Sequence, residues 1–186
     1  MRMPQPPLTL RRWTRVEYER LVDLGMFDRE PIELIGGQLI VAEPKGSPHS
    51  TAVGMAQDAL QAALPAGWII RVQDVLALDD ESAPEPDIAV VQGTLPAHPA
   101  LAIEVAESSL RFDRHAKGSL YARAGMADYW IVNLVDRVLE VYREPVADAS
   151  APWGWRYRSV ETLSPPSRVT PLAVPIGPVA VGALLP

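Results

Sequence analysis

The chain has 186 residues, of which 48% are hydrophobic; it contains no cysteine and carries a formal net charge of −6. This length and apolar fraction fit one folded domain, and they exclude an intrinsically disordered chain and a disulfide-stabilised scaffold. No stretch approaches the roughly 18 continuous apolar residues of a membrane span, and no secretion signal is recognisable, so we expect a cytoplasmic protein. The acidic balance disfavours nucleic-acid binding unless a local basic surface is present.

The first third of the chain predicts a helix and a hairpin. After a Pro-rich leader at residues 1–13, the spacing of TRVE is that of a capping box, which predicts a helix from Thr14 to Gly25. In PIELIGGQLIVAEP, two short apolar runs flank Gly36 and Gly37. Two adjacent glycines tolerate the positive φ angles of a primed turn, so this segment is expected to form a β-hairpin.

The central third alternates between helical and extended patterns. Apolar residues recur at helical spacing over 48–64, and the segments WIIRVQDVLAL (68–78), PDIAVV (86–91) and LAIEVA (101–106) read as strands. The spacing of apolar residues then predicts one continuous helix over 109–124. The three strands are expected to form the centre of a sheet.

The last third adds strands and a tail. DYWIVNL (128–134) and RVLEVYR (137–143) read as a second hairpin, followed by the strand WGWRYRSVETL (153–163) and a Pro-rich tail at 163–186. With no repeat, linker or second domain, residues 1–186 are expected to form one domain. The order of elements favours an α/β or mixed α+β fold in which helices flank a central sheet.

Two carboxylates fall on neighbouring strands of this predicted sheet. If PDIAVV and LAIEVA form an antiparallel hairpin whose loop is centred between Leu95 and Pro96, Asp87 lies opposite Glu104. Residues directly opposite on neighbouring strands point to the same face, with Cβ atoms about 4.5–5.5 Å apart. The two acids are therefore expected to converge; a slip of one residue in the loop would send one of them to the other face.

The neighbours of Glu104 leave room for an ion. Alternation along the strand places Ala102 and Ala106 on the same face as Glu104. Two close carboxylates repel each other unless they share a proton or bind a hard cation such as Mg²⁺, and a metal ion is the simpler explanation at neutral pH. The alternative is that Asp87 only caps a turn and Glu104 is solvated on an exposed sheet face.

A lysine follows on the next predicted helix. Asp113, Lys117 and Tyr121 fall at i, i+4 and i+8, which places them on one polar strip. From there Lys117 can reach over the sheet edge to the two acids, where it would stabilise charge on a phosphate or orient a water molecule. The alternative is a solvated lysine that pairs with Asp113.

Several segments also carry a family resemblance: ELIGGQLI, SPHS, PEPDIAVV, LAIEVAESS, DRHAKGSLYARAGMADYWIVN and VLEVYR. Their order and spacing resemble the Uma-two family of restriction-endonuclease-like proteins within the PD-(D/E)XK nuclease superfamily. The resemblance implies a restriction-endonuclease-like core, with a mixed central sheet flanked by helices, extra β-hairpins, and a divalent metal held by acids on adjacent strands. It implies that Asp87 is the acid of the PD motif and Glu104 that of the (D/E)XK motif, while Val105 contributes its backbone carbonyl to the metal.

The resemblance extends to three further positions. Glu33 matches an additional upstream acid, and His49 matches a histidine that opens a helix; each has the alternative of being a solvated surface residue. The lysine of the (D/E)XK motif is missing, because its position is occupied by Ala106. Lys117, on the next helix, is the residue that fits its role.

Two functions follow from these residues. The first is a Mg²⁺- or Mn²⁺-dependent nuclease acting on nucleic acid, with DNA favoured, that uses Asp87, Glu104, Lys117, Glu33 and His49. The second is a catalytically inactive, homodimeric binding protein that keeps the nuclease fold. The acidic net charge favours the second function, and the retained acids and lysine favour the first.

Overall fold

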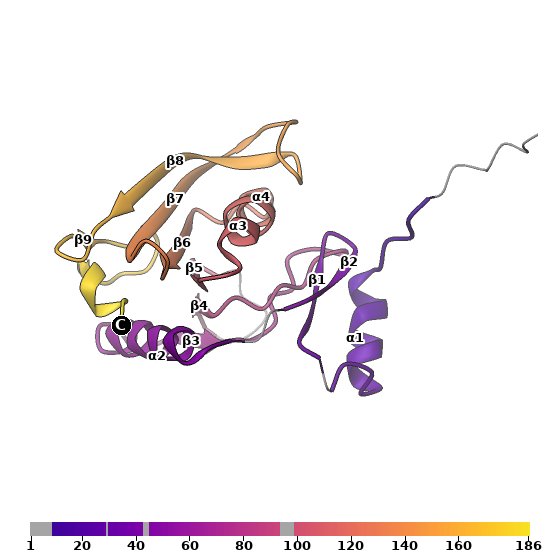
Figure 1. Cartoon of the computed structure of the whole chain (residues 1–186), viewed down its shortest axis with the longest axis horizontal. Helices are drawn as coiled ribbons and strands as arrows, with labels where there is room; N and C mark the ends of the chain where they lie inside the picture. Colours follow the sequence, from indigo (N-terminus) through magenta and orange to yellow (C-terminus); the bar gives the residue numbers. More distant parts are fainter. Residues whose placement is uncertain (1–8, 29, 43–44, 94–98) are drawn as a thin grey trace, which may run out of the picture.

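A computed structural model describes residues 9–28, 30–42, 45–93 and 99–186 (Figure 1). The centre of the loop between PDIAVV and LAIEVA lies outside these residues. One six-stranded sheet dominates the fold, in the spatial order β3 (Trp68–Val72), β4 (Ile88–Gln92), β5 (Leu101–Ala106), β6 (Asp128–Asn133), β7 (Val138–Ala147) and β8 (Trp155–Leu163). Strands β5 and β6 are parallel and all other neighbours antiparallel. The prediction of a mixed sheet flanked by helices is confirmed.

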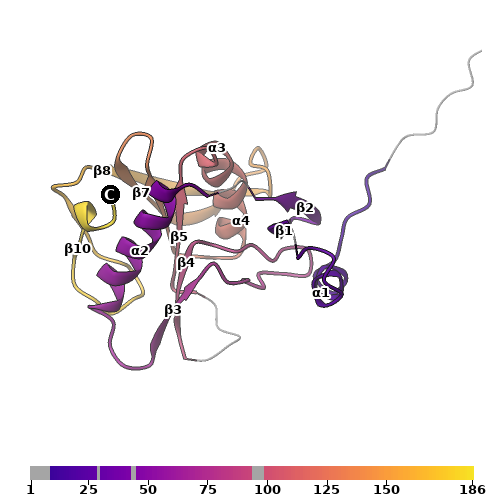
Figure 2. The same cartoon turned by 60° about the horizontal axis from the view of Figure 1, so that its bottom comes forward.

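Helix α2 (Ser47–Gln61) covers one face of the sheet (Figure 2). Pro48 lies in its first turn, where a missing N–H costs nothing. The buried apolar side chains of α2 recur at helical spacing: Ala52, Val53, Ala56 and Leu60. They pack against the odd-numbered residues of β5. The segment after β8 covers the same face, with β9 (Arg168–Val169) paired to β10 (Val179–Ala180) and a 3₁₀ turn at Val181–Ala183.

The opposite face is covered by a helical segment that changes form twice. It consists of α3 (Leu110–Phe112), a π-helical turn (Asp113–Lys117) and α4 (Gly118–Arg123). The predicted helix over 109–124 is therefore present as an unbroken helical segment, but its middle turn is π-helical instead of α-helical. The Tyr129 hydroxyl, reaching across from β6, donates to the carbonyl of Asp113 at 3.2 Å, which compensates a backbone group in the wide turn. The extra residue per turn rotates the residues downstream of it, so Tyr121 and Ala122 are buried against the sheet.

The N-terminal elements form a small unit at one end of the molecule (Figure 1). Helix α1 (Arg15–Asp23) begins with the predicted capping box, and β1 (Ile32–Ile35) pairs with β2 (Gln38–Val41) around the two predicted glycines. This unit is bonded to the segment between β3 and β4, for example through the N–H of Ala83 and the carbonyl of Leu34 at 2.8 Å.

That segment replaces half of a predicted strand. The strand expected over 68–78 ends at Val72, because Gln73 adopts a left-handed φ of 49°. Arg71 then donates to the side chain of Asp74 and to the carbonyl of Val75, which stabilises a turn. The chain after the turn runs outward to support the N-terminal unit. None of the described helices is long and apolar enough to cross a bilayer.

Candidate metal and phosphate site

The predicted register of the two central strands is confirmed. Ile88 lies opposite Ile103, and Ala89 lies opposite Ala102. Continuing this pairing by one residue brings Asp87 opposite Glu104, and both side chains are buried, with 3% exposure each. The opposition of the two acids follows from strand pairing alone.

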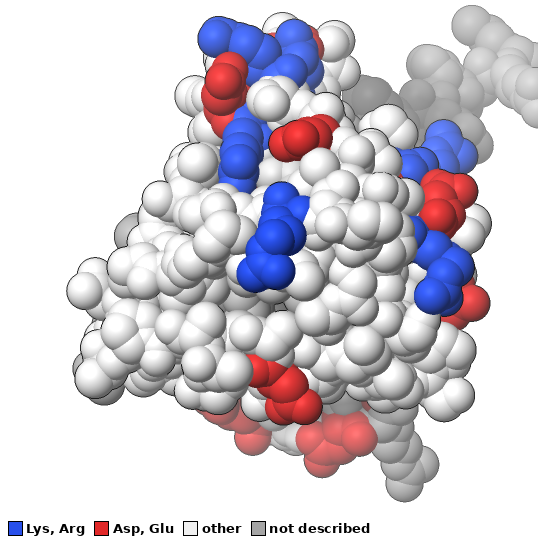
Figure 3. Space-filling model, turned by 90° about the vertical axis from the view of Figure 1, so that its left-hand side faces the viewer, with Lys and Arg blue, Asp and Glu red and all other residues white. Residues whose placement is uncertain are grey.

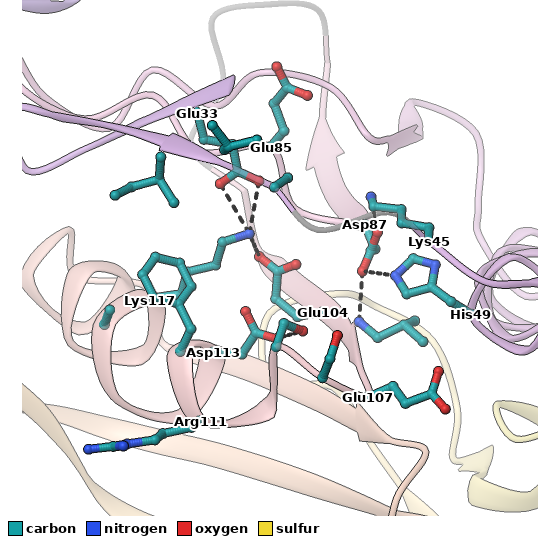
Figure 4. Close-up of a pocket in the computed structure, with 18 of the residues that line it drawn as sticks. Glu33, Lys45, His49, Glu85, Asp87, Glu104, Glu107, Arg111, Asp113 and Lys117 are labelled. Carbon is teal, nitrogen blue, oxygen red and sulfur yellow. Dashed lines mark hydrogen bonds and ion pairs between the residues drawn. The ribbon is translucent and has the colours of Figure 1, made fainter. Parts of the chain in front are cut away.

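A cavity of about 570 Å³ opens beside these acids (Figure 4). It lies between the N-terminal hairpin, the start of α2, the ends of β4 and β5, and the π-helical turn. Every residue that the sequence singled out for the site lines it: Glu33, His49, Asp87, Glu104, Val105 and Lys117. The structure therefore brings together residues from five separate segments.

Lys117 joins two carboxylates inside the cavity. Its Nζ lies 2.9 Å from Oε1 of Glu104, and 3.2 and 3.1 Å from Oε1 and Oε2 of Glu33. The side chain of Lys117 is only 7% exposed, so the alternative of a solvated lysine paired with Asp113 was wrong. The Tyr121 hydroxyl donates to the same Oε1 of Glu104 at 2.9 Å. Lys117 and Tyr121 thus both donate to Oε1 of Glu104. The other oxygen of Glu104, Oε2, has no hydrogen-bond partner among the described residues.

Asp87 has a separate set of partners. Nζ of Lys45 lies 2.7 Å from Oδ1, while Nε2 of His49 and the backbone N–H of Val105 donate to Oδ2 at 3.0 and 2.8 Å. Burial opposes ionisation of Asp87, but the hydrogen bond from His49 and the charge of Lys45 hold its pKa well below the usual range. Asp87 is therefore a carboxylate throughout the physiological pH range.

The carbonyl of Val105 has no donor from β4. The backbone N–H and C=O of Val105 point towards β4, since the N–H donates to the side chain of Asp87. The register of the two strands places Pro86 opposite Val105. An antiparallel ladder would supply the N–H of that residue to the carbonyl, but proline has none. The PD pair therefore provides an acid and, through its proline, leaves a neighbouring carbonyl oxygen available.

The cavity carries an excess of acid. Its lining includes six acidic residues, Glu33, Glu85, Asp87, Glu104, Glu107 and Asp113, against three Lys or Arg residues, Lys45, Arg111 and Lys117. Burial raises the pKa of both Glu104 and Glu85, and neighbouring carboxylates add to the effect. Glu85 and Lys45 were missed by the sequence reasoning, although Glu85 lies two residues before Asp87 and so has the spacing of a residue on the same side of an extended chain.

This donor set fits a hard divalent cation. Carboxylate and carbonyl oxygens are the ligands that Mg²⁺ and similar ions prefer, and an added cation would offset the surplus negative charge. Among the described residues, no three His, Asp or Glu side chains converge as a ready-made metal centre. The candidate ligands are instead two acids and one backbone oxygen: Asp87, Glu104 and Val105.

The buried carboxyl of Asp113 predicts a pH dependence of stability. Burial raises its pKa to about 6, from an ordinary value of 3.8. The folded state therefore binds this proton more tightly than the unfolded chain, and stability falls as the pH rises through this interval. We expect Asp113→Asn to raise the free energy of unfolding by about 1–3 kcal/mol at pH 8 but not at pH 4. Urea denaturation at both pH values measures this, and equal gains at both would contradict it.

Comparison with known proteins places this chain in a family. The family model Uma2, described as "Putative restriction endonuclease", matches residues 15–180. The chain belongs to the Uma2 family. The match spans the N-terminal unit, the whole six-stranded sheet and most of the C-terminal segment, and it confirms the resemblance read from the sequence motifs.

A solved structure has a similar fold to this Uma2 chain. It is the crystal structure of a "putative nuclease belonging to DUF820" from Anabaena variabilis ATCC 29413, with a TM-score of 0.63 and 15% sequence identity, covering 82% of this chain and 88% of that one. At this identity the similarity concerns the fold alone. No curated protein matches the chain.

In this Uma2 chain, alanine occupies position 106, where the resemblance implied the lysine of the (D/E)XK motif. Ala106 is buried at the end of β5 with no exposed surface. Lys117 approaches Glu104 from the π-helical turn instead, and its ammonium lies beside the carboxylate.

Proposed function

We propose that this protein is a divalent-metal-dependent nuclease that hydrolyses phosphodiester bonds in nucleic acid. The observation that carries the proposal is the arrangement of Asp87 and Glu104 on neighbouring strands, with Lys117 bonded to Glu104, at the floor of an open cavity. Membership of the Uma2 family supports it, because the model of that family is described as "Putative restriction endonuclease".

The ion of this proposal is Mg²⁺ or Mn²⁺, held by Asp87, Glu104 and the carbonyl of Val105. When bound, such an ion supplies an activated water molecule and stabilises negative charge on the phosphate and the leaving oxygen. Glu104 has one oxygen without a hydrogen-bond partner in the described part of the chain, and Asp87 is held ionised, so both acids suit this role.

The remaining residues support these acids. His49 donates to Asp87 and fixes the orientation of its carboxylate. Lys117 compensates the charge of Glu104, and Glu33 holds Lys117 from the opposite side. Each of these contacts is a charge-assisted hydrogen bond in a buried place, where such bonds are strongest.

The distribution of surface charge affects how the protein could bind nucleic acid. The face in Figure 3 is mostly uncharged, and its Lys and Arg side chains form separate groups with acidic residues among them. With a net charge of −6, long contacts along a duplex backbone would be poorly compensated. We therefore expect recognition to concentrate at the cavity, with DNA as the first substrate to test.

Incubation with supercoiled, linear and single-stranded DNA and with RNA, each with Mn²⁺, tests the proposal. The wild type is expected to cut at least one substrate, and Glu104→Gln to lower the rate by more than about 100-fold, since loss of even an indirect metal partner costs about 10- to 100-fold. Glu161→Gln, at an exposed position of strand β8, is the matched control and should retain the rate. Cutting that survives Glu104→Gln would indicate contamination.

Calorimetric titration with Mn²⁺ separates metal binding from cutting. The wild type is expected to bind the ion, and Asp87→Ala to lose most of the affinity because one of two carboxylate ligands is removed. If the wild type bound no ion, or the variant bound it equally well, the protein would instead be the inactive binding module that keeps the nuclease fold.

A further inference from the structure

Lysine is used in this chain at two positions only. The sequence contains 17 Lys and Arg residues, and all of them except Lys45 and Lys117 are arginines. Both lysines line the same cavity, and each is bonded to one of the two central acids. The two ammonium groups therefore belong to one site, although 71 residues of sequence lie between them.

Their environments differ sharply. Lys117 is 7% exposed and contacts two carboxylates, whereas the side chain of Lys45 is 36% exposed and, among the described residues, is paired with Asp87. Burial by itself would lower the pKa of Lys117, but Glu104 and Glu33 raise it far above the usual range. The Lys117 ammonium is thus fixed in place and permanently charged, while the Lys45 ammonium reaches solvent at the mouth of the cavity.

The cost of moving each lysine also differs. If Lys117 left its place, Glu104 and Glu33 would remain as buried carboxylates without a cation, which is strongly unfavourable. If Lys45 left Asp87, the carboxylate would keep His49 and the N–H of Val105 on Oδ2, with the amide of Gln73 at 3.4 Å from Oδ1. Because Asp87 keeps these partners and the Lys45 side chain is already partly in solvent, Lys45 can exchange one oxyanion for another at a smaller cost than Lys117.

We propose that Lys45 is the residue that contacts the phosphate of the substrate, while Lys117 stays an internal counter-ion that never leaves the acids. A lysine ammonium binds phosphate as a compact point charge, and its three donors can reach a phosphodiester oxygen from the cavity mouth. The identity of the substrate as a phosphodiester rests on the proposed nuclease function. The division of roles between the lysines rests on their contacts and exposure.

The presence of only two lysines makes the proposal directly measurable. Protein labelled with ¹³C-lysine should give two side-chain signals by NMR, and Lys45→Arg assigns them by removing one. On titration with a short oligothymidylate in Ca²⁺ buffer, we expect the Lys45 signal to shift and the Lys117 signal to stay. A shift of Lys117 without Lys45, or binding seen by fluorescence anisotropy with neither signal moving, would overturn the proposal.

Binding by variants gives a second measurement. Lys45→Gln is expected to weaken oligothymidylate binding about tenfold, the scale of one lost charged hydrogen bond, and to lower the slope of log K against log salt by about one. Lys45→Arg should restore most of the affinity. Arg158→Gln, an exposed cation on strand β8 that does not line the cavity, is the matched control and should bind as the wild type.

The outcomes separate this inference from the nuclease proposal. If oligothymidylate moves the Lys45 signal but Mn²⁺ never yields cutting, the phosphate contact stands and the nuclease function fails. If nucleic acid is cut in a Glu104-dependent way and Lys45→Gln binds and cuts as the wild type, the nuclease function stands and this inference fails. Absence of any oligothymidylate binding also overturns it.

Discussion

Replacement of Lys117 by methionine is expected to lower the free energy of unfolding by about 3–5 kcal/mol at pH 8, the scale of removing one partner from a buried ion pair. Methionine preserves the length and apolar stem of the side chain, so packing changes little. The substitution removes the ammonium group that compensates the charges of both Glu104 and Glu33, and this accounts for the lower stability. Urea denaturation of the two proteins measures the difference.

The pH dependence identifies the cause of this loss. Burial already raises the pKa of Glu104 above its ordinary value of 4.5, and removal of Lys117 takes away the main group that lowers it. The folded variant would therefore bind a proton that the unfolded chain releases, so its deficit should shrink as the pH falls from 8 towards 5. A deficit that stays constant over this range would point to packing instead of charge.

A double variant and the other lysine serve as controls. Lys117→Met/Glu104→Gln should recover part of the stability, because one of the two uncompensated charges is removed, while Glu33 remains. Lys45→Gln, which removes a partly exposed pair, should cost less than about 1 kcal/mol. If the two lysine variants lost equal stability, the contrast between their environments would be wrong.

Gly36→Ala is the second substitution with a large expected effect. Gly36 has φ of 55° in the turn between β1 and β2, and a Cβ atom there would lie 2.2 Å from the ring of Trp153. The ring is itself held, because its Nε1 donates to the carbonyl of Ala116 in the π-helical turn at 3.1 Å. The alanine therefore incurs both the strain of a left-handed residue and a steric clash, together about 2–5 kcal/mol.

Gly67→Ala separates these two contributions. Gly67 also has a positive φ, of 87°, but a Cβ atom there meets nothing within 4 Å. It should therefore lose only the backbone part, about 1–2 kcal/mol. Denaturation in guanidinium chloride measures both variants, and equal losses would show that Trp153 yields without cost. Because the displaced hairpin also carries Glu33, Gly36→Ala should in addition perturb the NMR signal of Lys117, whereas Gly67→Ala should not.

The pairing of Asp87 with Glu104 was predictable from the sequence. It depends on strand alternation and on the length of one hairpin, both of which are local, and the observed register agrees. The capping box of α1 and the two-glycine hairpin were predictable for the same reason, since each depends on residues within one short segment. The extent of the strand beginning at Trp68 was not, because its end is set by the left-handed Gln73 and by the bonds of Arg71 in the turn, which the apolar pattern does not show.

The sequence placed Lys117 near these acids, but tertiary structure alone decided which carboxylates each lysine compensates. Lys117 meets Glu33 across 84 positions of sequence, and it does so through a π-helical turn held by Tyr129 from another strand. Lys45 also contacts a distant residue, Asp87, and it does so from a loop whose sequence has no helical or strand periodicity. Sequence by itself determined the order of the strands along the chain and the two acids at its centre, because periodicity and turn chemistry act over neighbouring residues. The partners of those acids come from distant segments, and only the packed fold brings them within bonding distance.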